Sequence, residues 1–323
     1  MTDWTAADVP DCSDKTIVVT GANSGLGYEA TKELARKGAT VVMACRSLDR
    51  GREAAYQIRD ELPNGTGGRL DVRRCDLADL ASVESFADGV RADYGELDVL
   101  CNNAGVMAIP RQETAEGFEM QLGVNHLGHF ALTGQLLDLL VATPGETRVV
   151  THSSGAHTAG SVDFDDLMRE RSYDKWEAYG QSKLANLHFA YELQRRLDDA
   201  GVTDTKSVAC HPGWAATNLQ YRGPEEMGSR VRYGAMKIAN GLIAQSAAQG
   251  ALPLLYAATA PDAEGGGYYG PDGFQGMRGY PEKQESSDAS YDDAVSDRLW
   301  AVSEELTGVS YDVDALATAS ATV

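Results

Sequence analysis

Short β-branched segments alternate with segments of helical periodicity along most of the chain, and this alternation constrains the fold more than any other feature. Strands are predicted at residues 17–19, 40–45, 69–75, 97–101, 148–151, 206–210 and 267–269. Helices are predicted between them, at residues 28–37, 48–62, 80–94, 116–140, 175–200 and 245–258, with a last short helix at 294–306. Strands connected through helices form a parallel sheet covered on both faces. The sequence therefore predicts a doubly wound α/β fold of about seven strands that binds its ligand beyond the strands' carboxyl ends.

The turn after the first strand carries three glycines, Gly21, Gly25 and Gly27, in the segment TGANSGLG. Because glycine lacks a Cβ atom, backbone N–H groups can approach a ligand there, and the N-terminus of the following helix favours negative charge. The spacing G-x-x-x-G-x-G predicts a phosphate-binding turn, one residue longer at the front than the standard dinucleotide fingerprint. For this segment alone, a tight turn that binds nothing is the alternative.

No break in composition divides the chain, so a single domain is predicted over residues 15–308, after an N-terminal extension at 1–14. Residues 213–243 are irregular and follow the sixth predicted strand, which favours a segment that covers the substrate. The apolar side chains within 224–243 are equally compatible with core packing. Residues 309–323 are predicted to form a disordered tail.

The chain carries 48 acidic and 28 basic residues, a formal net charge of −20. Such a charge repels nucleic acid and anionic membrane surfaces, so neither is predicted as a partner. It favours adaptation to high salt, in which carboxylates stay hydrated and their mutual repulsion is screened. An acidic protein without this adaptation is the alternative.

If the acidic composition is an adaptation to salt, the midpoint of thermal unfolding rises as KCl is raised from dilute buffer to molar concentration. The physical reason is that screening relieves the repulsion among carboxylates, which destabilises the folded state most in dilute buffer. Circular dichroism melts over a KCl series measure this. A midpoint that does not rise contradicts the high-salt interpretation.

Five cysteines, at positions 12, 45, 75, 101 and 210, are scattered without a C-x-x-C pair, and four of them end predicted strands, where a small thiol packs well. The first 14 residues contain neither a basic region nor an apolar run, and no segment reaches the roughly 18 apolar residues of a membrane span. We therefore expect a reducing, cytoplasmic environment, with no secretory signal and no membrane partner.

Segments that carry chemistry follow the predicted strands. NNAG (102–105), THSSG (151–155) and HPGWAATN (211–218) come after the fourth, fifth and sixth strands, and YGQSK (179–183) lies in the helix between the last two. Tyr179 and Lys183 are four residues apart on that helix, so their side chains share a face. An ammonium beside a phenol favours the phenolate and is expected to lower the pKa of Tyr179, which could then exchange a proton with a carbonyl or alcohol oxygen. For this pair alone, a solvated helix face is the alternative.

Taken in order and spacing, T-G-x-x-x-G-x-G, N-N-A-G, the serine before Y-x-x-x-K and P-G-x-x-x-T make residues 15–270 resemble the classical short-chain dehydrogenases/reductases. The resemblance implies a Rossmann-type fold and a nicotinamide-dependent oxidoreductase. It also implies four catalytic residues: Asn125, Ser154, Tyr179 and Lys183. Ser154 is preferred to Ser153 because it falls three positions after Thr151, which replaces the family's asparagine. In the family's arrangement Ser154 holds the substrate oxygen, while Asn125 supports a water and Lys183 in a proton relay.

The same resemblance implies the cofactor site. Its residues would be Gly21, Asn23, Ser24, Gly25, Leu26, Gly27, Arg46, Asp76, Leu77, Asn103, Ala104, Gly105, Tyr179, Lys183, Pro212, Gly213 and Thr217. The second predicted strand ends without an acidic residue that could bond a ribose 2′-hydroxyl, and Arg46 stands where an arginine would pair with a 2′-phosphate. NADP(H) is therefore the predicted cofactor, and NAD(H) is the alternative if Arg46 is only solvated.

His126 and His129 lie three residues apart in a predicted helix, a spacing that could suit a metal ion. Neither an acidic residue nor a cysteine accompanies them, and the expected chemistry needs no metal. Packing is therefore the preferred interpretation of both side chains, and no metal site is predicted.

The segments ACR, VNHLGHF, SSGAH and YGQSKLANLHFAYEL most resemble the retinol dehydrogenase-like branch of the family, as does the separation of 25 residues between Ser154 and Tyr179. That branch acts on lipophilic alcohols and carbonyl compounds, and the family forms dimers or tetramers through its two long helices, here from residues 116 and 175. The expected reaction is hydride transfer between nicotinamide and a lipophilic ketone, aldehyde or secondary alcohol. The intact Tyr179–Lys183 pair disfavours a dinucleotide sensor without turnover, and the glycine spacing disfavours a sugar-nucleotide epimerase or dehydratase.

Overall fold

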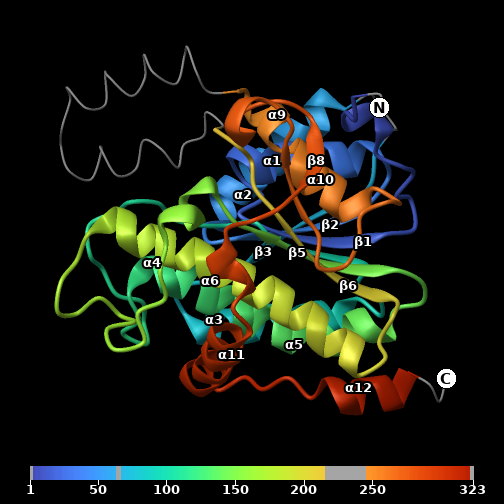
Figure 1. The fold of residues 1–323 in the computed structure, drawn as a ribbon. Helices are drawn as coiled ribbons and strands as arrows, with labels where there is room; N and C mark the ends of the chain where they lie inside the picture. Colours follow the sequence, from blue (N-terminus) through green and yellow to red (C-terminus); the bar gives the residue numbers. More distant parts are fainter. Residues whose placement is uncertain (1–2, 63–66, 215–244, 321–323) are drawn as a thin grey trace.

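The structure is a computed structural model that describes residues 3–62, 67–214 and 245–320. Its centre is an eight-stranded sheet in the order β3-β2-β1-β4-β5-β6-β7-β8 (Figure 1). The strands are β1 Thr16–Thr20, β2 Thr40–Cys45, β3 Leu70–Arg74, β4 Val99–Asn102, β5 Thr147–His152, β6 Thr205–Cys210, β7 Tyr268–Pro271 and β8 Pro281–Gln284. The first seven run parallel, so their carboxyl ends share one edge of the sheet. The doubly wound α/β fold is confirmed, with one strand more than predicted.

Helices cover both faces of this sheet (Figure 1). One face carries α1 Gly25–Arg36, α2 Leu48–Glu61, α9 Ala247–Gly250 and α10 Leu252–Thr259. The other carries α3 Leu80–Asp93, α5 Gly128–Ala142 and α6 Lys175–Asp199, with α11 Asp293–Thr307 and α12 Val313–Ser320 packed outside α5 and α6. Short 3-10 helices at Ala6–Asp8, Gly155–Ala159, Phe274–Gly276 and Asp288–Tyr291 complete the described elements. Each face therefore buries its own apolar layer, and the sheet separates the two.

The helical region predicted over 116–140 is present from Met120 to Ala142, but it is not one regular α-helix. The chain instead forms α4 (Met120–Leu122), a π-helical turn at Gly123–Leu127, and then α5. A π-helical turn closes wider hydrogen-bonded rings than an α-helix and is rare outside functional sites. The 3.6-residue periodicity of the apolar side chains does not reveal it, because one extra residue in one turn changes the pattern little. Asn125 lies inside this turn.

The C-terminal part of the chain is more ordered than predicted. Strand β8 pairs antiparallel with β7, although its sequence PEKQ has no strand propensity. The predicted disordered tail is wrong over residues 309–320, since α12 packs on α5 and the Tyr311 hydroxyl donates to the carbonyl oxygen of Phe130. The Tyr311 ring also lies edge-on to Trp300, with the two ring centroids 4.6 Å apart. The contacts of Tyr311 therefore fix the segment 309–320, whose composition is typical of a disordered tail.

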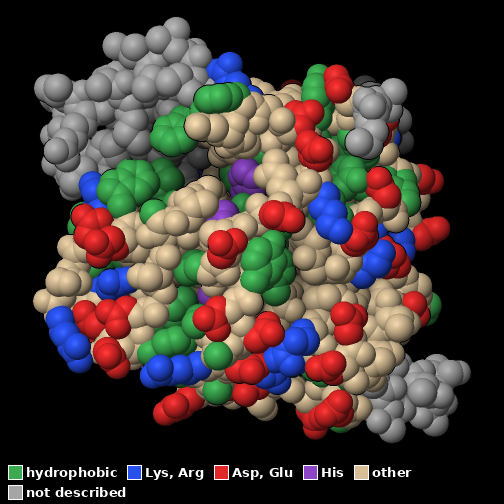
Figure 2. All heavy atoms as spheres, in the orientation of Figure 1, with side chains coloured by type: hydrophobic (Ala, Val, Ile, Leu, Met, Phe, Trp, Pro, Cys, Tyr) green, Lys and Arg blue, Asp and Glu red, His purple; other side chains and the backbone are tan. Residues whose placement is uncertain are grey.

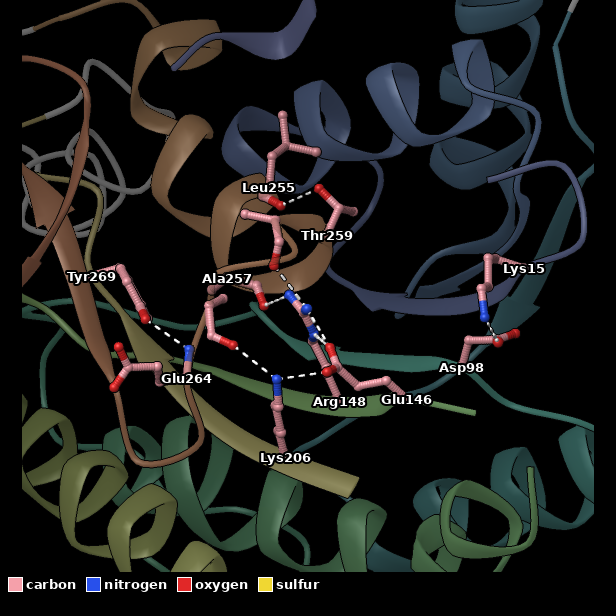
Figure 3. Close-up of polar contacts among 12 residues, drawn as sticks. Lys15, Asp98, Glu146, Arg148, Lys206, Leu255, Ala257, Thr259, Glu264 and Tyr269 are labelled. Atoms are coloured by element: carbon pink, nitrogen blue, oxygen red, sulfur yellow. Dashed lines mark hydrogen bonds and ion pairs between the residues drawn. The ribbon is translucent and has the colours of Figure 1, made fainter. Parts of the chain in front are cut away.

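A buried arginine organises the opposite, amino-terminal edge of the sheet (Figure 3). From the start of β5, Arg148 donates to the carbonyl oxygens of Ala257 and Ala260 at 3.0 and 2.8 Å, and its Nε donates to Glu146 at 2.8 Å. Lys206 reaches the second carboxylate oxygen of Glu146 at 2.6 Å. The last turn of a helix leaves carbonyl groups without partners, and Arg148 satisfies two of them at the end of α10. This edge holds the sheet and α10 together on the side away from the strands' carboxyl ends.

Acidic and basic side chains are interspersed over the face shown in Figure 2, and the carboxylates spread across it rather than gathering in one patch. On this face the acidic charge is therefore not concentrated in a single patch. Among the described residues, no helix is both long and apolar enough to span a membrane.

Candidate active site

A cleft opens at the carboxyl edge of the sheet, beside β1, β2 and β4, and it collects most of the predicted cofactor residues. Twelve of them line it: Gly21, Asn23, Ser24, Gly25, Leu26, Gly27, Arg46, Asp76, Leu77, Asn103, Ala104 and Gly105. Its lining also includes residues that the sequence analysis did not name, among them Ser47, Arg50, Met120 and Val124. The fold thus brings four separate sequence segments to one place.

The glycine turn forms a wall of accessible backbone in this cleft. Gly21 and Gly25 have φ angles of +68° and +57°, a region that favours glycine. A Cβ atom on Gly27 would lie 2.5 Å from the Gly21 carbonyl oxygen, so a side chain there would collide with the turn. Ser24, the N-cap of α1, makes no side-chain capping hydrogen bond, which leaves the first N–H groups of the helix for a ligand. These donors and the helix dipole fit a pyrophosphate.

The part of the cleft beyond β2 is basic. Arg46 and Arg50 are exposed and line it, and neither forms an ion pair within the described residues. Ser47 lies between them and caps α2 through the Arg50 backbone N–H. Two guanidinium groups beside a helix N-terminus fit a phosphate monoester. Sequence reasoning missed Arg50, although its spacing of four residues from Arg46, around the start of a predicted helix, was a usable signal.

Asn103 connects the glycine turn to β5. Its Nδ2 donates to the Thr20 carbonyl oxygen at 2.8 Å, and its Oδ1 accepts from His152 Nδ1 at 3.1 Å. Since the Thr20 carbonyl fixes the amide orientation, the His152 proton is assigned to Nδ1. Burial, with the nearby Lys183 ammonium, lowers the pKa of His152 to about 3, so the imidazole is neutral at neutral pH. Sequence reasoning missed His152, which gave no signal beyond its place in THSSG.

Tyr179, Ser154 and Lys183 converge at the next part of the edge. Tyr179 and Lys183 lie on the same side of α6, are 5% and 4% exposed, and place the lysine Nζ 5.9 Å from the tyrosine ring centroid. The Ser154 side chain lies near the phenol and acts to lower the pKa of Tyr179, while its hydroxyl accepts from the Ala156 backbone N–H at 3.2 Å. A Cβ atom on Gly105, which lines the cleft, would lie 3.7 Å from Lys183 Nζ. The lysine amine therefore lies behind Gly105, next to the cleft, but none of Tyr179, Ser154 and Lys183 is among the residues that line the cleft.

The predicted lowering of the Tyr179 pKa is wrong for this structure. Burial raises the pKa of Tyr179 to about 12, against a smaller lowering by the Ser154 side chain. Burial also lowers the pKa of Lys183 to about 8. Lys183 does not offset the effect of burial on Tyr179, because its ammonium donates to the His152 carbonyl oxygen at 3.0 Å. The ammonium lies over the tyrosine ring, 5.9 Å from the ring centroid. At neutral pH the pair is therefore a protonated phenol beside an ammonium.

Asn125 is fixed from two sides inside the π-helical turn. Its Oδ1 accepts from the Val106 backbone N–H at 2.8 Å, and its Nδ2 donates to the Val106 carbonyl oxygen and to Ser182 Oγ, both at 2.9 Å. Ser182 lies on α6 between Tyr179 and Lys183, and its hydroxyl donates to the Tyr179 carbonyl oxygen at 2.8 Å. The structure thus links Asn125 to the helical turn that carries the tyrosine and the lysine. Ser182 is a further residue that sequence reasoning missed.

His126 and His129 have separate, structural partners. His129 Nδ1 lies 3.0 Å from the Asn125 carbonyl oxygen and its Nε2 lies 2.9 Å from Thr20 Oγ1, while His126 Nε2 lies 2.9 Å from Ser303 Oγ. Both rings are buried, as the packing interpretation expects. Within the described residues no group of three side chains could hold a metal ion.

The segment after β6 is described as far as residue 214. Gly213 has a φ of +62°, and a Cβ atom there would lie 2.6 Å from the Met277 carbonyl oxygen. The Pro212 carbonyl oxygen accepts from Gln245 Nε2 at 2.7 Å. Pro212 and Gly213 therefore form a fixed turn at the carboxyl end of β6. Thr217 and residues 215–243 of the predicted covering segment lie outside the described residues.

Comparison with known proteins identifies the family. A family model described as short chain dehydrogenase matches residues 15–227. The chain belongs to the short-chain dehydrogenases. It is 40% identical over 304 residues to mouse retinol dehydrogenase 14, covering 91% of this chain and 86% of that protein, which places it in the retinol dehydrogenase-like branch. The family assigns it as an oxidoreductase.

Solved structures agree with the fold. A crystal structure of an uncharacterized protein from Mycobacterium paratuberculosis is 43% identical, with a TM-score of 0.78 over 96% of this chain and 99% of that one. L-Sorbose reductase from Gluconobacter frateurii, solved with NADPH and L-sorbose, has a TM-score of 0.65 over 84% of this chain and 98% of its own. At 20% identity, that second likeness shows the fold alone.

Proposed function

We propose that this short-chain dehydrogenase is an NADP(H)-dependent alcohol dehydrogenase or carbonyl reductase in which Tyr179 is the general acid and base. The observation that carries the proposal is the convergence of Tyr179, Ser154 and Lys183 next to a cleft lined by the glycine turn. A phenol, a hydroxyl and an amine at one point suit proton transfer to or from a single substrate oxygen.

When bound, the nicotinamide supplies or accepts the hydride at the substrate carbon. In reduction, Ser154 donates a hydrogen bond to the carbonyl oxygen and stabilises the negative charge that develops on it. Tyr179 gives its hydroxyl proton to that oxygen, which completes the alcohol. In oxidation the same phenol oxygen receives the proton of the alcohol, so one residue serves both directions.

Lys183 acts on the charge that this transfer leaves on the tyrosine. With a pKa of about 8 it is mostly an ammonium at neutral pH. It does not lower the Tyr179 pKa in this structure, and we propose that it favours the phenolate once cofactor and substrate are bound. The His152 carbonyl oxygen accepts from this ammonium, and it also accepts from Asn186 Nδ2 at 2.9 Å. Asn125 supports the relay that returns a proton to this pair.

NADP(H) is the cofactor we propose, with NAD(H) as the weaker alternative. Arg46 and Arg50 form the basic end of the cleft, and their exposed guanidinium groups are suited to a 2′-phosphate. Asp76, which the family resemblance assigns to the adenine ring, lines the cleft, and its Oδ1 accepts from the Ala78 backbone N–H at 3.2 Å. An acidic residue at the end of β2, which would repel that phosphate, is replaced by Cys45 and Arg46.

Lipophilic ketones, aldehydes and secondary alcohols are the substrates we propose. The Trp176 ring is 49% exposed and lies edge-on to Tyr179, with the two ring centroids 6.3 Å apart. An exposed indole beside the proton donor offers apolar area to the body of a substrate. The retinol dehydrogenase name of the mouse relative supports the same class.

The proposal is tested by following nicotinamide absorbance with a panel of ketones, aldehydes and secondary alcohols, in high salt, with NADPH or NADP. We expect turnover of apolar substrates with the NADP pair. Tight NADPH binding without turnover of any panel member would favour the sensor alternative. Failure to bind either dinucleotide would contradict the cofactor site itself.

Assembly through α5 and α6, which the family resemblance predicts, meets an obstacle in this chain. The side chains of Leu299 and Trp300 on α11 are buried against these two helices, and Tyr311 packs on α5. A partner subunit would have to displace these residues from the same faces. We propose that a homodimer or homotetramer, if formed, uses another surface.

A further inference from the structure

The C-terminal helix α11 packs on both elements that carry the proposed proton-transfer residues. It contacts α6, which carries Tyr179 and Lys183, and the π-helical turn, which carries Asn125 (Figure 1). Leu299 lies in one apolar cluster with Leu122, which precedes the turn, and Leu127, its last residue. Trp300 stacks on Phe189 of α6, with the ring centroids 5.8 Å apart. Helix α11 therefore packs against both α6 and the π-helical turn, although none of its residues lines the cleft.

Two buried hydrogen bonds, each between a serine of α11 and a histidine, accompany this apolar packing. Ser303 Oγ lies 2.9 Å from His126 Nε2 in the π-helical turn, and Ser296 Oγ lies 2.8 Å from His188 Nδ1 on α6. All four side chains are buried. Both bonds join a serine of α11 to a histidine, but only the first involves a residue next to Asn125, namely His126.

The π-helical turn depends on its surroundings. Such a turn has poorer backbone geometry than an α-helix, so it persists where neighbouring groups hold it. Three sets of contacts hold this one: Asn125 with Val106 and Ser182, His129 Nδ1 with the Asn125 carbonyl oxygen, and His126 with Ser303. The first two lie on the active-site side, and the third is the polar contact from α11.

We propose that Ser303 is a positioning residue, which holds the π-helical turn through His126 so that Asn125 stays seated against Val106 and Ser182. The inference rests on the proposed function, because it assigns Asn125 to the proton relay. Ser303 acts through the turn and does not line the cleft.

The surroundings of His126 explain why the loss of this bond would matter. The Phe130 and Phe189 rings lie 6.1 and 6.2 Å from its ring, and His126 Nδ1 has no hydrogen-bond partner in the described part of the chain. Removing the Ser303 hydroxyl leaves both ring nitrogens unbonded in an apolar site, which is unfavourable. Burial lowers the pKa of His126 to about 3, so protonation does not relieve this at neutral pH. A rearrangement of the turn that gives the His126 nitrogens new partners then becomes favourable, and it would shift Asn125 as well.

Two variants test the proposal in the full-length chain, Ser303→Ala and its matched control Ser296→Ala. Kinetics with the best panel substrate and hydrogen–deuterium exchange of the peptide spanning residues 120–130 are measured for both. We expect Ser303→Ala to lower kcat by about ten-fold, since small misplacements of catalytic groups slow reactions strongly, and to leave the KM for NADPH unchanged. We also expect faster exchange at 120–130. Ser296→Ala should lose similar thermal stability but keep kcat within about two-fold and exchange at 120–130 unchanged.

The exchange and kinetic results separate this inference from the function on which it rests. Unchanged exchange at 120–130 in Ser303→Ala overturns the inference, whether or not the wild-type chain turns over any substrate. Equal losses of kcat in the two variants also overturn it, because they would mean that only general stability was lost. A wild-type chain without activity, in which Ser303→Ala alone loosens the turn, would refute the proposed function and leave the positioning contact supported.

Discussion

Replacing Tyr179 with phenylalanine lowers kcat for carbonyl reduction by about 10²–10⁴-fold, the range that positioned proton transfer contributes. The variant keeps the ring, which is buried and lies edge-on to Trp176, and removes only the hydroxyl. The Ser154 hydroxyl keeps its hydrogen bond from the Ala156 backbone N–H, and the glycine turn and the basic end of the cleft are untouched. NADPH binding, measured by fluorescence titration, should therefore change little while kcat collapses. Full activity of Tyr179→Phe would exclude the proposed proton path.

The wild-type pH profile provides the companion measurement. Lys183 is charged below its pKa of about 8 and loses its proton as pH rises through that value. Because the ammonium favours the phenolate that proton donation leaves behind, the rate of carbonyl reduction should fall as pH rises through about 8. The residual rate of Tyr179→Phe should lack this decline, since no phenolate forms. A wild-type rate that is flat between neutral pH and pH values well above 8 would contradict the role of Lys183.

The parts of the site that the sequence predicts are those encoded by short local spacing. Gly21, Gly25 and Gly27 lie in a single turn, and Tyr179 and Lys183 are one helical turn apart, so strand, turn and helix rules place them directly. The parallel topology then brings the ends of neighbouring strands to one edge, which is why twelve predicted cofactor residues share one cleft. Their roles stay predictions, but their juxtaposition follows from the fold.

Residues whose importance comes from tertiary contacts gave no comparable signal. His152 matters because Asn103 and Lys183 approach it from different elements, and Ser303 reaches His126 across 177 positions of the chain. Strand β8 forms because β7 presents an open edge, and Tyr311 orders the tail because Phe130 and Trp300 form its site. No local periodicity encodes these partners. The same holds for the Tyr179 pKa, which burial controls and sequence spacing does not report.

Reversing the charge at the basic end of the cleft reverses the choice of cofactor. We expect the double variant Arg46→Asp with Arg50→Ser to lower kcat/KM with NADPH by about 10²-fold or more, since each hydrogen bond to a charged group contributes about 1.5–3 kcal/mol. The introduced carboxylate repels a 2′-phosphate and can accept a hydrogen bond from a ribose 2′-hydroxyl, so kcat/KM with NADH should hold or rise. The ratio of the two kcat/KM values therefore inverts.

The matched control for this reversal is Arg52→Asp, two residues after Arg50 on α2. Arg52 is 67% exposed, lies 3.6 Å from Asp49, and does not line the cleft. It makes the same charge change as the Arg46→Asp part of the double variant, so most of any general electrostatic effect on a chain of charge −20 appears in both. A preference that is unchanged in the double variant, or shifted equally by Arg52→Asp, would show that Arg46 and Arg50 are only solvated side chains. A reversal confined to the cleft variant would instead support the proposed 2′-phosphate site between β2 and α2.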